Sequence, residues 1–419
     1  MSSRHRQHQR PITSTDWLLP HRERFLKNIA DQGYSGGTLT HYSGATSQFC
    51  KEVAKRGLRQ GQLVGSVLSK VCAAVLKGNR HHTQSYKKSC VKRFVDNLAE
   101  AGVAKRPKPA RQRPTARDRL RTEYETYLQV QRGLSEATIQ NRLNFFDRFM
   151  TFRFGAKLGN LNAITPDNLV AFLRKVLFRP RSFRDTSPPT HLRALFRFLF
   201  WIGKTKHDLA ASLPSVARPR DTHLPRSLKP KEIERLIDAA WSADAPGRRN
   251  YAMLLVMARL GLRAPEVIAI KLDDIDWRAG TILIRGKGKR HDHMPLPEDV
   301  GKAIVDYIRN GRRGATRILF VASKAPYRPF GSGRIVNAAL GTAFKVTGLK
   351  PPQKYIGSHL LRHSLATDML RKGASLDEIG DVLRHRSRKS TAIYAKHDIE
   401  GLRSIARDWP VQRGRACPL

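Results

Sequence analysis

Apolar residues recur at helical spacing along most of the chain, and this pattern predicts a mainly helical protein. In the stretch 139–150, Ile139, Leu143, Phe146 and Phe149 mark one face of an amphipathic helix. The stretch 191–201 carries a similar apolar stripe, which is typical of a helix that packs in a core. The spacing predicts further helices over 166–170, 231–241, 249–262, 300–309, 334–346 and 359–371.

Two short segments, 281–285 and 291–295, are predicted to be strands. They flank a Gly-Lys-Gly-Lys run at 286–289, so the sequence predicts a hairpin with a basic tip. Further on, Gly373 suits the end of a helix, and the Ser-Leu-Asp-Glu run at 375–378 fits a capping box that begins the next helix. The expected fold class is therefore mainly α with a small antiparallel sheet.

Two stretches rich in proline and arginine, 105–119 and 213–227, interrupt the helical pattern and are predicted to be linkers. They divide the chain into three expected domains. These are a basic helical N-terminal domain (1–104), a helical middle domain (118–217) and a C-terminal domain with a tail (228–419), joined by linkers at 105–117 and 218–227.

A short motif recurs in the first two domains. Gly33-Tyr34-Ser35-x-x-Thr38-Leu39 returns 100 residues later as Gly133-Leu134-Ser135-x-x-Thr138-Ile139. In each copy the serine is predicted to be an N-cap that opens an amphipathic helix. Duplication of a small helical bundle and chance both remain open as explanations of so short a repeat.

The charge of the chain indicates an acidic partner. Its 419 residues include 78 Lys and Arg against 34 Asp and Glu, a net charge of +44. Self-repulsion on this scale favours a polyanion as partner, which leaves DNA, RNA or an anionic membrane surface. The best apolar run, 251–262, is too short to span a bilayer and contains Arg259. No apolar signal core follows the basic first residues, so an intracellular protein is expected.

The residue types that hold metals or nucleoside triphosphates are scarce. No Walker loop is present, and the Asp-Asp-Ile-Asp run at 273–276 suits turn and capping chemistry better than a metal pair. Cys50, Cys72, Cys90 and Cys417 match no disulfide or zinc pattern, and the histidine pair at 81–82 is expected at the surface. Chemistry without metal or cofactor is therefore expected.

A phosphodiester can also be opened by a covalent nucleophile, aided by cations on the nonbridging oxygens and by an acid for the leaving alcohol. The C-terminal segment holds such a set. Arg263 lies at a helix junction, Lys287 on the hairpin tip, and His359 and Arg362 three apart on one helix face; His385 and Tyr394 follow. Taken singly, each cation could be a surface charge, the histidine a core residue and Tyr394 a packing aromatic, and Tyr355 competes as nucleophile.

In order and spacing, four segments resemble the catalytic domain of the tyrosine recombinases, the phage-integrase and Xer-like family. The segments are ARLGLRAPEVIAIKLDDID, IRGKGKRHDHMPLP, HLLRHSLATDMLRKG and VLRHRSRKSTAIYAKHD. The resemblance covers about 180 residues of the C-terminal domain, and extends more loosely to 118–217 as the family's helical core-binding domain. It does not reach the first hundred residues, which are a candidate arm or extra DNA-binding domain.

The resemblance implies a role for each matching residue. Arg263 and Arg362 match the two catalytic arginines, which suit bidentate contact with phosphate oxygens. His359 and His385 match the two histidines that hydrogen-bond the phosphate, and His359 also assists proton transfer. Lys287 matches the lysine that acts as general acid. Tyr394 matches the nucleophile that forms a 3′-phosphotyrosyl bond. Glu266 matches an acidic residue that supports the site from behind.

The chain departs from the family pattern at two places. Arg384 stands where the family usually has glycine before the later histidine, and Ala264-Pro265 replaces a small polar pair after Arg263. A helix end that relied on a glycine with positive φ must be rearranged or strained here. Neither change removes a reacting group, so activity is expected.

The function that this resemblance implies is site-specific DNA recombination or integration for a mobile element, by a homotetramer on two double-stranded DNA sites, alone or with other recombinases, in the bacterial cytoplasm. A catalytically silent DNA-binding protein and a topoisomerase or resolvase remain alternatives. Outward-facing cations are candidates for DNA contact: Arg142, Arg148, Arg193, Arg197, Lys289 and Arg290. An apolar stripe in 398–419 is a candidate helix that docks on a neighbour.

Overall fold

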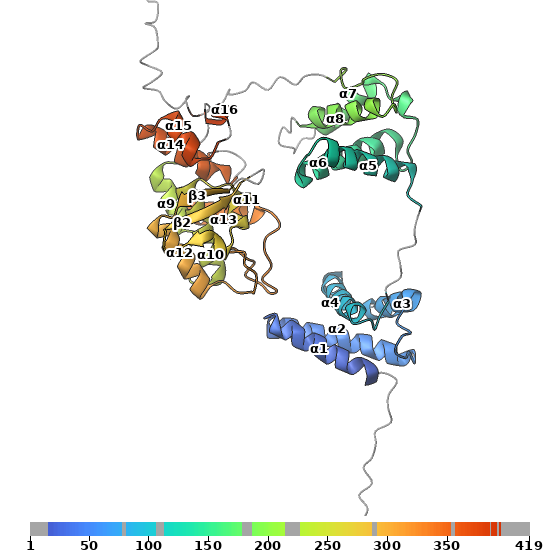
Figure 1. The fold of residues 1–419 in the computed structure, drawn as a ribbon. Helices are drawn as coiled ribbons and strands as arrows, with labels where there is room; N and C mark the ends of the chain where they lie inside the picture. The colour runs from blue at the N-terminus through green and yellow to red at the C-terminus, as the bar shows by residue number, and fades with distance from the viewer. Residues whose placement is uncertain are drawn as a thin grey trace, which may run out of the picture. The chain divides into compact units, whose positions relative to one another are not determined.

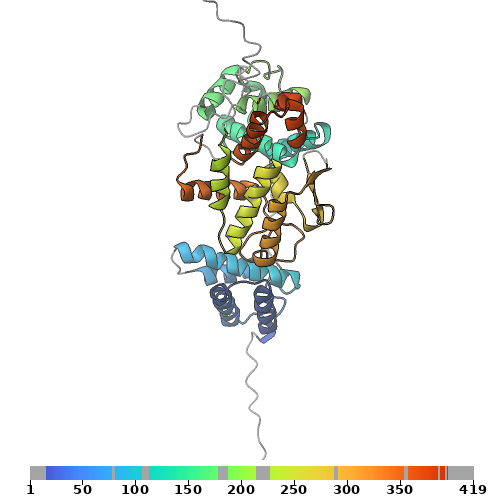
Figure 2. The same cartoon turned by 90° about the vertical axis from the view of Figure 1, so that its left-hand side faces the viewer.

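The chain is described from a computed structural model, which is traced in Figure 1 and, turned by 90°, in Figure 2. The described residues are 16–77, 81–105, 113–177, 187–213, 227–286, 291–352, 357–385, 387–391 and 394. Two compact units make up the chain: Lys108–Arg220 is one, and Met1–Pro107 with Asp221–Leu419 is the other. Among the described helices, none is both long and apolar enough to cross a membrane. The expected division into three domains stays a prediction.

Residues 16–77 and 81–105 form helices around a small aromatic core. The elements are η1 (Asp16–Leu18), α1 (Leu19–Asp31), α2 (Gly36–Lys55), α3 (Gly65–Leu76) and α4 (His81–Glu100). Helix α2 packs against α1, α3 and α4. Phe94 of α4 packs its ring against Phe25 and Phe49, with ring centroids 5.1 and 5.5 Å apart. These apolar contacts form a core of their own.

The unit 108–220 is also helical. It contains α5 (Ala116–Thr126), a π-helical turn η2 (Tyr127–Gln131), α6 (Glu136–Phe154), η3 (Leu161–Ala163), α7 (Pro166–Leu177) and α8 (Pro188–Trp201). A capping box begins α5, because Thr115 and Asp118 each accept a hydrogen bond from the other's backbone N–H. On α6, Phe149 is fully buried and meets Phe172 of α7 and Phe196 of α8 edge to face, 5.3 Å from each.

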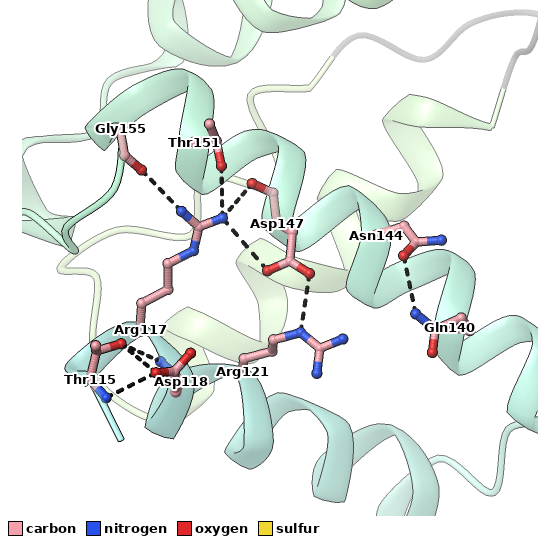
Figure 3. A network of polar contacts seen from close by, with 9 residues as sticks. All are labelled: Thr115, Arg117, Asp118, Arg121, Gln140, Asn144, Asp147, Thr151 and Gly155. Atoms are coloured by element: carbon pink, nitrogen blue, oxygen red, sulfur yellow. Dashed lines mark hydrogen bonds and ion pairs between the residues drawn. The ribbon is translucent and has the colours of Figure 1, made fainter. Parts of the chain in front are cut away.

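Polar side chains connect α5 to α6 above this core (Figure 3). Arg117 of α5 donates to the Gly155 carbonyl at 3.0 Å and to Thr151 Oγ1 at 2.8 Å. Arg121, one turn later, donates through Nε to Asp147 Oδ2 at 3.1 Å. Because these groups are partly exposed, the ion pairs add about 1 kcal/mol at most, and they orient the two helices more than they stabilise them.

The repeated Gly-x-Ser-x-x-Thr motif has the same local geometry in both copies. Ser35 and Ser135 stand at the N-cap positions of α2 and α6, as the sequence predicts. Each serine hydroxyl bonds to the hydroxyl three residues on, at 3.0 Å in the first copy and 2.9 Å in the second. Gly33 and Gly133, before the caps, have φ of +78° and +56°, a left-handed conformation that favours glycine.

Four arginines of this unit are expected to face outward, and two of them, Arg148 of α6 and Arg197 of α8, are exposed. Arg142 and Arg193 are half-buried, and contact of any of the four with DNA stays a prediction. Arg193 donates to the Leu213 carbonyl at 3.0 Å, and the charge of Arg142 acts on the buried Tyr124 hydroxyl. Helical spacing places a side chain on a face, but these long side chains fold back over the core to reach a polar partner.

The remaining segment is built around one buried helix, α10 (Ala245–Leu260), which packs against α9, α11, α12, α13 and α14. The elements around it, which Figure 1 labels in part, are α9 (Pro230–Asp238), α11 (Ala264–Ala269), η4 (Leu272–Asp274), α12 (Glu298–Asn310), α13 (Arg334–Thr347), α14 (His359–Arg371), α15 (Leu376–Val382) and α16 (Arg388–Thr391). A helix that is apolar nearly all round belongs in a core. The predicted capping box at 375–378 begins α15.

The sheet has the antiparallel order β1-β2-β3. Strands β2 (Thr281–Arg285) and β3 (His291–Pro295) have the predicted bounds, and their register pairs Arg285 with His291 beside the hairpin tip. A short strand β1 (Ile275–Asp276), which the sequence did not predict, pairs with β2. The fold class, mainly α with a small antiparallel sheet, is confirmed.

The acidic run at 273–276 caps turns, as the sequence predicts. Asp274 Oδ2 accepts from the Lys271 backbone N–H at 2.8 Å and pairs with Arg285. Asp276 Oδ1 accepts from the backbone N–H groups of Arg278 and Ala279. Among the residues that the structure describes, no group of three or more His, Cys, Asp or Glu side chains could hold a metal ion.

We expect truncation of Phe149 to destabilise the unit 108–220 strongly. Phe149→Ala removes a fully buried ring that contacts two helices, so the free energy of unfolding should fall by about 3–5 kcal/mol. Urea unfolding of the full chain, followed by circular dichroism, measures this change. The matched control is Val130→Ala at a side chain that is 73% exposed, which should change the free energy by about 0.5 kcal/mol or less. Equal effects of the two variants would contradict the core assignment.

Candidate active site

The tight turn between α10 and α11 positions Arg263. Helix α10 ends at Gly261, whose φ is +60°, and a Cβ there would lie 2.6 Å from Leu383 Cδ2. Glycine is therefore required both by the conformation and by the close packing. Two residues later Arg263 caps α11, with a side chain that is 37% exposed and held by Glu266. Its guanidinium is thus fixed on one side and accessible on the other.

Glu266 is a buried carboxylate between two arginines. Its Oε1 accepts a hydrogen bond from Arg263 Nη1 at 2.8 Å. Its Oε2 accepts from the Arg263 backbone N–H at 2.9 Å and from Arg384 Nη2 at 2.8 Å. Burial raises the pKa of Glu266, but the backbone hydrogen bond and the charges of Arg384 and Arg263 outweigh burial and hold the pKa below its usual range. The carboxylate therefore stays ionised and orients both guanidinium groups.

Arg362 is the most buried cation of the site, with 3% exposure. It lies on α14 and donates to the carbonyls of Gly261 and Leu383, which end α10 and α15. Desolvation, and then the positive charge of Arg263, lowers its pKa to about 10. It remains charged at neutral pH, so the site holds a cation that donates hydrogen bonds to two neutral backbone carbonyls.

The two expected histidines flank these cations in the neutral form. Desolvation lowers the pKa of His359, and the charges of Arg362 and Arg263 lower it further, although the side chain keeps contact with solvent. Desolvation and the same arginines lower the pKa of His385 to about 4, and its Nδ1 lies 2.8 Å from Thr391 Oγ1. A neutral imidazole still carries one N–H, so each ring can donate one hydrogen bond.

Tyr394, the expected nucleophile, is buried beside this cluster. Its ring is 1% exposed and stacks nearly parallel to His385, with ring centroids 6.4 Å apart. Burial raises the pKa of Tyr394 to about 12, although the charges of Arg362 and Arg263 act in the opposite direction. The arginines favour the phenolate as expected, but desolvation is the larger effect and the phenol stays protonated.

The structure thus brings Arg263, Glu266, His359, Arg362, His385 and Tyr394 into one cluster of interacting charges. The roles assigned to these residues stay predictions. Lys287, Lys289 and Arg290 lie outside the described residues, as do the competing Tyr355 and the tail 398–419. The two predicted linkers also lie mostly outside them.

The sequence did not single out His363, although it directly follows Arg362 in the segment HLLRH. Its Nδ1 lies 2.7 Å from the Tyr394 hydroxyl oxygen, and the two ring centroids are 5.6 Å apart. The one signal that could have found His363 is its place directly after Arg362 in the sequence. His363 and Tyr394 are 31 positions apart, so the sequence does not reveal their contact.

Arg384 keeps the left-handed backbone that its glycine counterpart would have. Its φ is +54°, and it follows the end of α15 at Leu383. The backbone is therefore strained rather than rearranged, at a cost of about 1–2 kcal/mol for a residue with a Cβ. The side chain returns a contact that glycine lacks, because its Nη2 pairs with Glu266 at 2.8 Å and its Nε lies 3.7 Å from Asp292.

Comparison with known proteins gives consistent matches. The model of the phage integrase family matches residues 226–400. The protein y4rA of Sinorhizobium fredii, whose name describes it as a candidate integrase/recombinase, is 42% identical over 71% of this chain and 72% of its own length. The tyrosine recombinase XerC of Bacillus subtilis is 27% identical over 66% and 91%. A solved lambda integrase(75–356) dimer bound to a COC′ core site is 18% identical, with a TM-score of 0.53 over 70% and 96%, a likeness of fold.

A pair of substitutions at position 384 separates the backbone strain from the ion pair. Arg384→Gly and Arg384→Ala both remove the contact with Glu266, so both should lower the free energy of unfolding. Only glycine relieves the strain, so we expect Arg384→Gly to be more stable than Arg384→Ala by about 1 kcal/mol. Urea unfolding of the two variants gives the difference. Alanine as stable as glycine would show that the left-handed backbone costs nothing there.

The buried environment of His385 predicts an unusual titration. Because its pKa is lowered on folding, His385 should stay neutral as the pH falls from about 6.5 and take up a proton only near pH 4. The folded state binds fewer protons than the unfolded state in this window, so stability falls as the pH falls through it. Histidine NMR signals of the full chain, assigned by comparison with His385→Gln, measure the midpoint. A midpoint near 6.5 would contradict the desolvated site.

Proposed function

The chain belongs to the phage integrase family of tyrosine recombinases, and from this premise we propose that it is the site-specific recombinase, or integrase, of a mobile element. The proposed reaction cuts and rejoins DNA through a covalent 3′-phosphotyrosyl intermediate. The observation that carries this proposal is the electrostatic coupling of one buried phenol, Tyr394, to two guanidinium groups, those of Arg362 and Arg263.

In this reaction, Arg263 and Arg362 bind the nonbridging oxygens of the scissile phosphate, where negative charge grows in the transition state. Two observations support this role: Glu266 fixes Arg263 with a face accessible, and Arg362 is charged while it donates to the neutral carbonyls of Gly261 and Leu383. The neutral rings of His359 and His385 donate hydrogen bonds to the same oxygens. Glu266 acts as a positioning residue for Arg263.

The bond changes balance without an external reactant. The Tyr394 Oη–phosphorus bond forms as the bond from phosphorus to the 5′ oxygen breaks, the phenol proton passes to a base at the site, and Lys287 protonates the 5′ oxygen. The phosphotyrosyl ester keeps the energy of the original phosphodiester, so a 5′ hydroxyl of another strand can reverse the step. The exchange therefore requires neither a nucleoside triphosphate nor a metal ion.

The proposed partner is double-stranded DNA, bound by a homotetramer on two sites, alone or with other recombinases. The net charge of +44 supports a polyanion as partner. Arg148 and Arg197 are exposed and remain candidates for phosphate contact, together with Lys289 and Arg290 on the hairpin. Arg142 and Arg193 are weaker candidates, because their side chains also serve the protein interior. Residues 1–104 are proposed to bind accessory DNA.

The relatives support a bacterial cytoplasmic protein that is associated with the nucleoid when it binds DNA, since both y4rA and XerC are bacterial. Neither alternative activity is favoured. A silent DNA-binding protein has no need of a buried phenol among cations, and the relatives are named as integrases and recombinases rather than topoisomerases.

The covalent intermediate provides the direct test. A DNA substrate made from the element's own junction sequence carries a nick beside the cleavage site, so that the released 5′-hydroxyl fragment is lost and the adduct accumulates. We expect a covalent protein–DNA band on a denaturing gel with the wild-type chain and none with Tyr394→Phe, which lacks the nucleophilic oxygen.

Tyr251→Phe, at a partly buried tyrosine on α10, is the matched control and should form the adduct as the wild-type chain does. Retention of the adduct in Tyr394→Phe would reject Tyr394 as nucleophile. Absence of any adduct from the wild-type chain would reject the proposed function itself.

A further inference from the structure

We propose that His363 accepts the phenol proton of Tyr394 during DNA cleavage, as the general base of the reaction. This inference rests on the proposed function, in which Tyr394 attacks the phosphate. Nothing in the residue pattern assigned a role to His363, and the assignment comes from the geometry of α14.

Successive residues of a helix point about 100° apart, so Arg362 and His363 serve different parts of the site. Arg362 points to the carbonyls of Gly261 and Leu383. His363 instead places its Nδ1 2.7 Å from the Tyr394 hydroxyl oxygen. That distance is within the reach that direct proton transfer to a general base requires.

The state of the phenol creates the need for such a base. Tyr394 has a pKa of about 12 and is protonated at neutral pH, so it is a weak nucleophile as it stands. The arginine charges that favour ionisation are the same ones that a bound phosphate would neutralise in part. Binding of the substrate therefore cannot be relied on to ionise the phenol, and the proton has to move to a neighbour as the bond to phosphorus forms.

Two other residues of the site that carry an acceptor atom already have partners. Glu266 is held by Arg263 and Arg384. His385 directs its Nδ1 to Thr391 Oγ1 and presents the flat face of its ring to Tyr394. Within the part of the chain that the structure describes, the Tyr394 hydroxyl forms its hydrogen bond with His363 Nδ1.

The proposed step conserves atoms and charge. As the Oη–phosphorus bond forms and the bond to the 5′ oxygen breaks, the phenol proton passes to His363 Nδ1 and an imidazolium results. The 5′ oxygen receives its proton from Lys287, as in the proposed function. On religation the imidazolium returns its proton to the departing phenolate oxygen, and His363 is again neutral.

Charged and titratable groups lie near His363 on its own helix and in the segment that follows α15. Arg362 and His359 lie on its own helix, the latter with its ring centroid 6.2 Å away, while His385 and Tyr394 face it from beyond α15. Lowered pKa values keep His359 and His385 neutral above pH 6.5. A change of cleavage rate in the neutral range that disappears on substitution of His363 therefore reports on His363.

The test measures single-turnover cleavage of two DNA substrates by the full chain between pH 5.5 and 9. One substrate has the ordinary 5′ oxygen at the scissile bond, and the other has a bridging sulfur, whose thiolate leaves without an acid. His363→Asn keeps an acceptor atom near the place of Nδ1 but cannot take up a proton. Lys287→Ala removes the proposed acid and serves as the matched control.

We expect His363→Asn to slow cleavage of both substrates by about 100-fold or more and to lose the rise of rate with pH that the neutral imidazole gives the wild-type chain. Lys287→Ala should be slow on the oxygen substrate and close to wild type on the sulfur substrate. Circular dichroism and DNA binding show whether the variant is folded, and His363→Gln takes the place of His363→Asn should the latter fail to fold.

Several outcomes overturn the inference. Rates and pH profile of His363→Asn within 3-fold of wild type would show that His363 takes no proton. A faster variant would show that the hydrogen bond merely restrains Tyr394, and rescue by the sulfur substrate would place His363 on the acid side. All of these leave the proposed function intact, because a wild-type chain that cleaves neither substrate is the result that rejects it.

Discussion

The active site depends on how three arginines are held close together with one buried carboxylate. Desolvation, and after it the positive charges of Arg263 and Arg384, lower the pKa of Arg362, so both burial and repulsion disfavour its charged form. Glu266 is the buried anion that pairs with Arg263 and Arg384. Backbone carbonyls of Gly261 and Leu383 compensate Arg362 only in part, so the folded chain retains positive charge that a phosphate can neutralise.

The same interactions join the elements of the catalytic segment. Arg362 connects α14 to the ends of α10 and α15, and Arg384 connects the end of α15 to Glu266 on α11. The two bonds of Arg362 end at helix termini, where carbonyls without an intrahelical partner are available, and the bond of Arg384 ends on the Glu266 carboxylate. The same contacts therefore fix both the helices and the charged groups. The left-handed backbone of Arg384 persists because its side chain pairs with Glu266.

Local sequence signals were enough to predict much of this fold. The bounds of β2 and β3 and the capping box of α15 follow from alternation and from residues a few positions apart. Arg263, Arg362 and Tyr394 were singled out by the resemblance of four separated segments to a known family, and their roles stay predictions. Contacts between distant segments were not predictable in this way, and they include the bond from His363 to Tyr394 and the inward turn of Arg142 and Arg193.

Burial of Tyr394 explains why its activation must be coupled to DNA. A phenolate already formed among free arginines would be a reactive oxygen in a protein with no phosphate bound. Desolvation prevents this, since it raises the pKa of Tyr394 to about 12 against the influence of Arg362 and Arg263. The phenol of Tyr394, the proposed nucleophile, is therefore kept neutral by the fold and close to an imidazole by one hydrogen bond. Loss of the proton is then favoured only as the oxygen shares its charge with phosphorus, which confines the reactivity to the moment of bond formation.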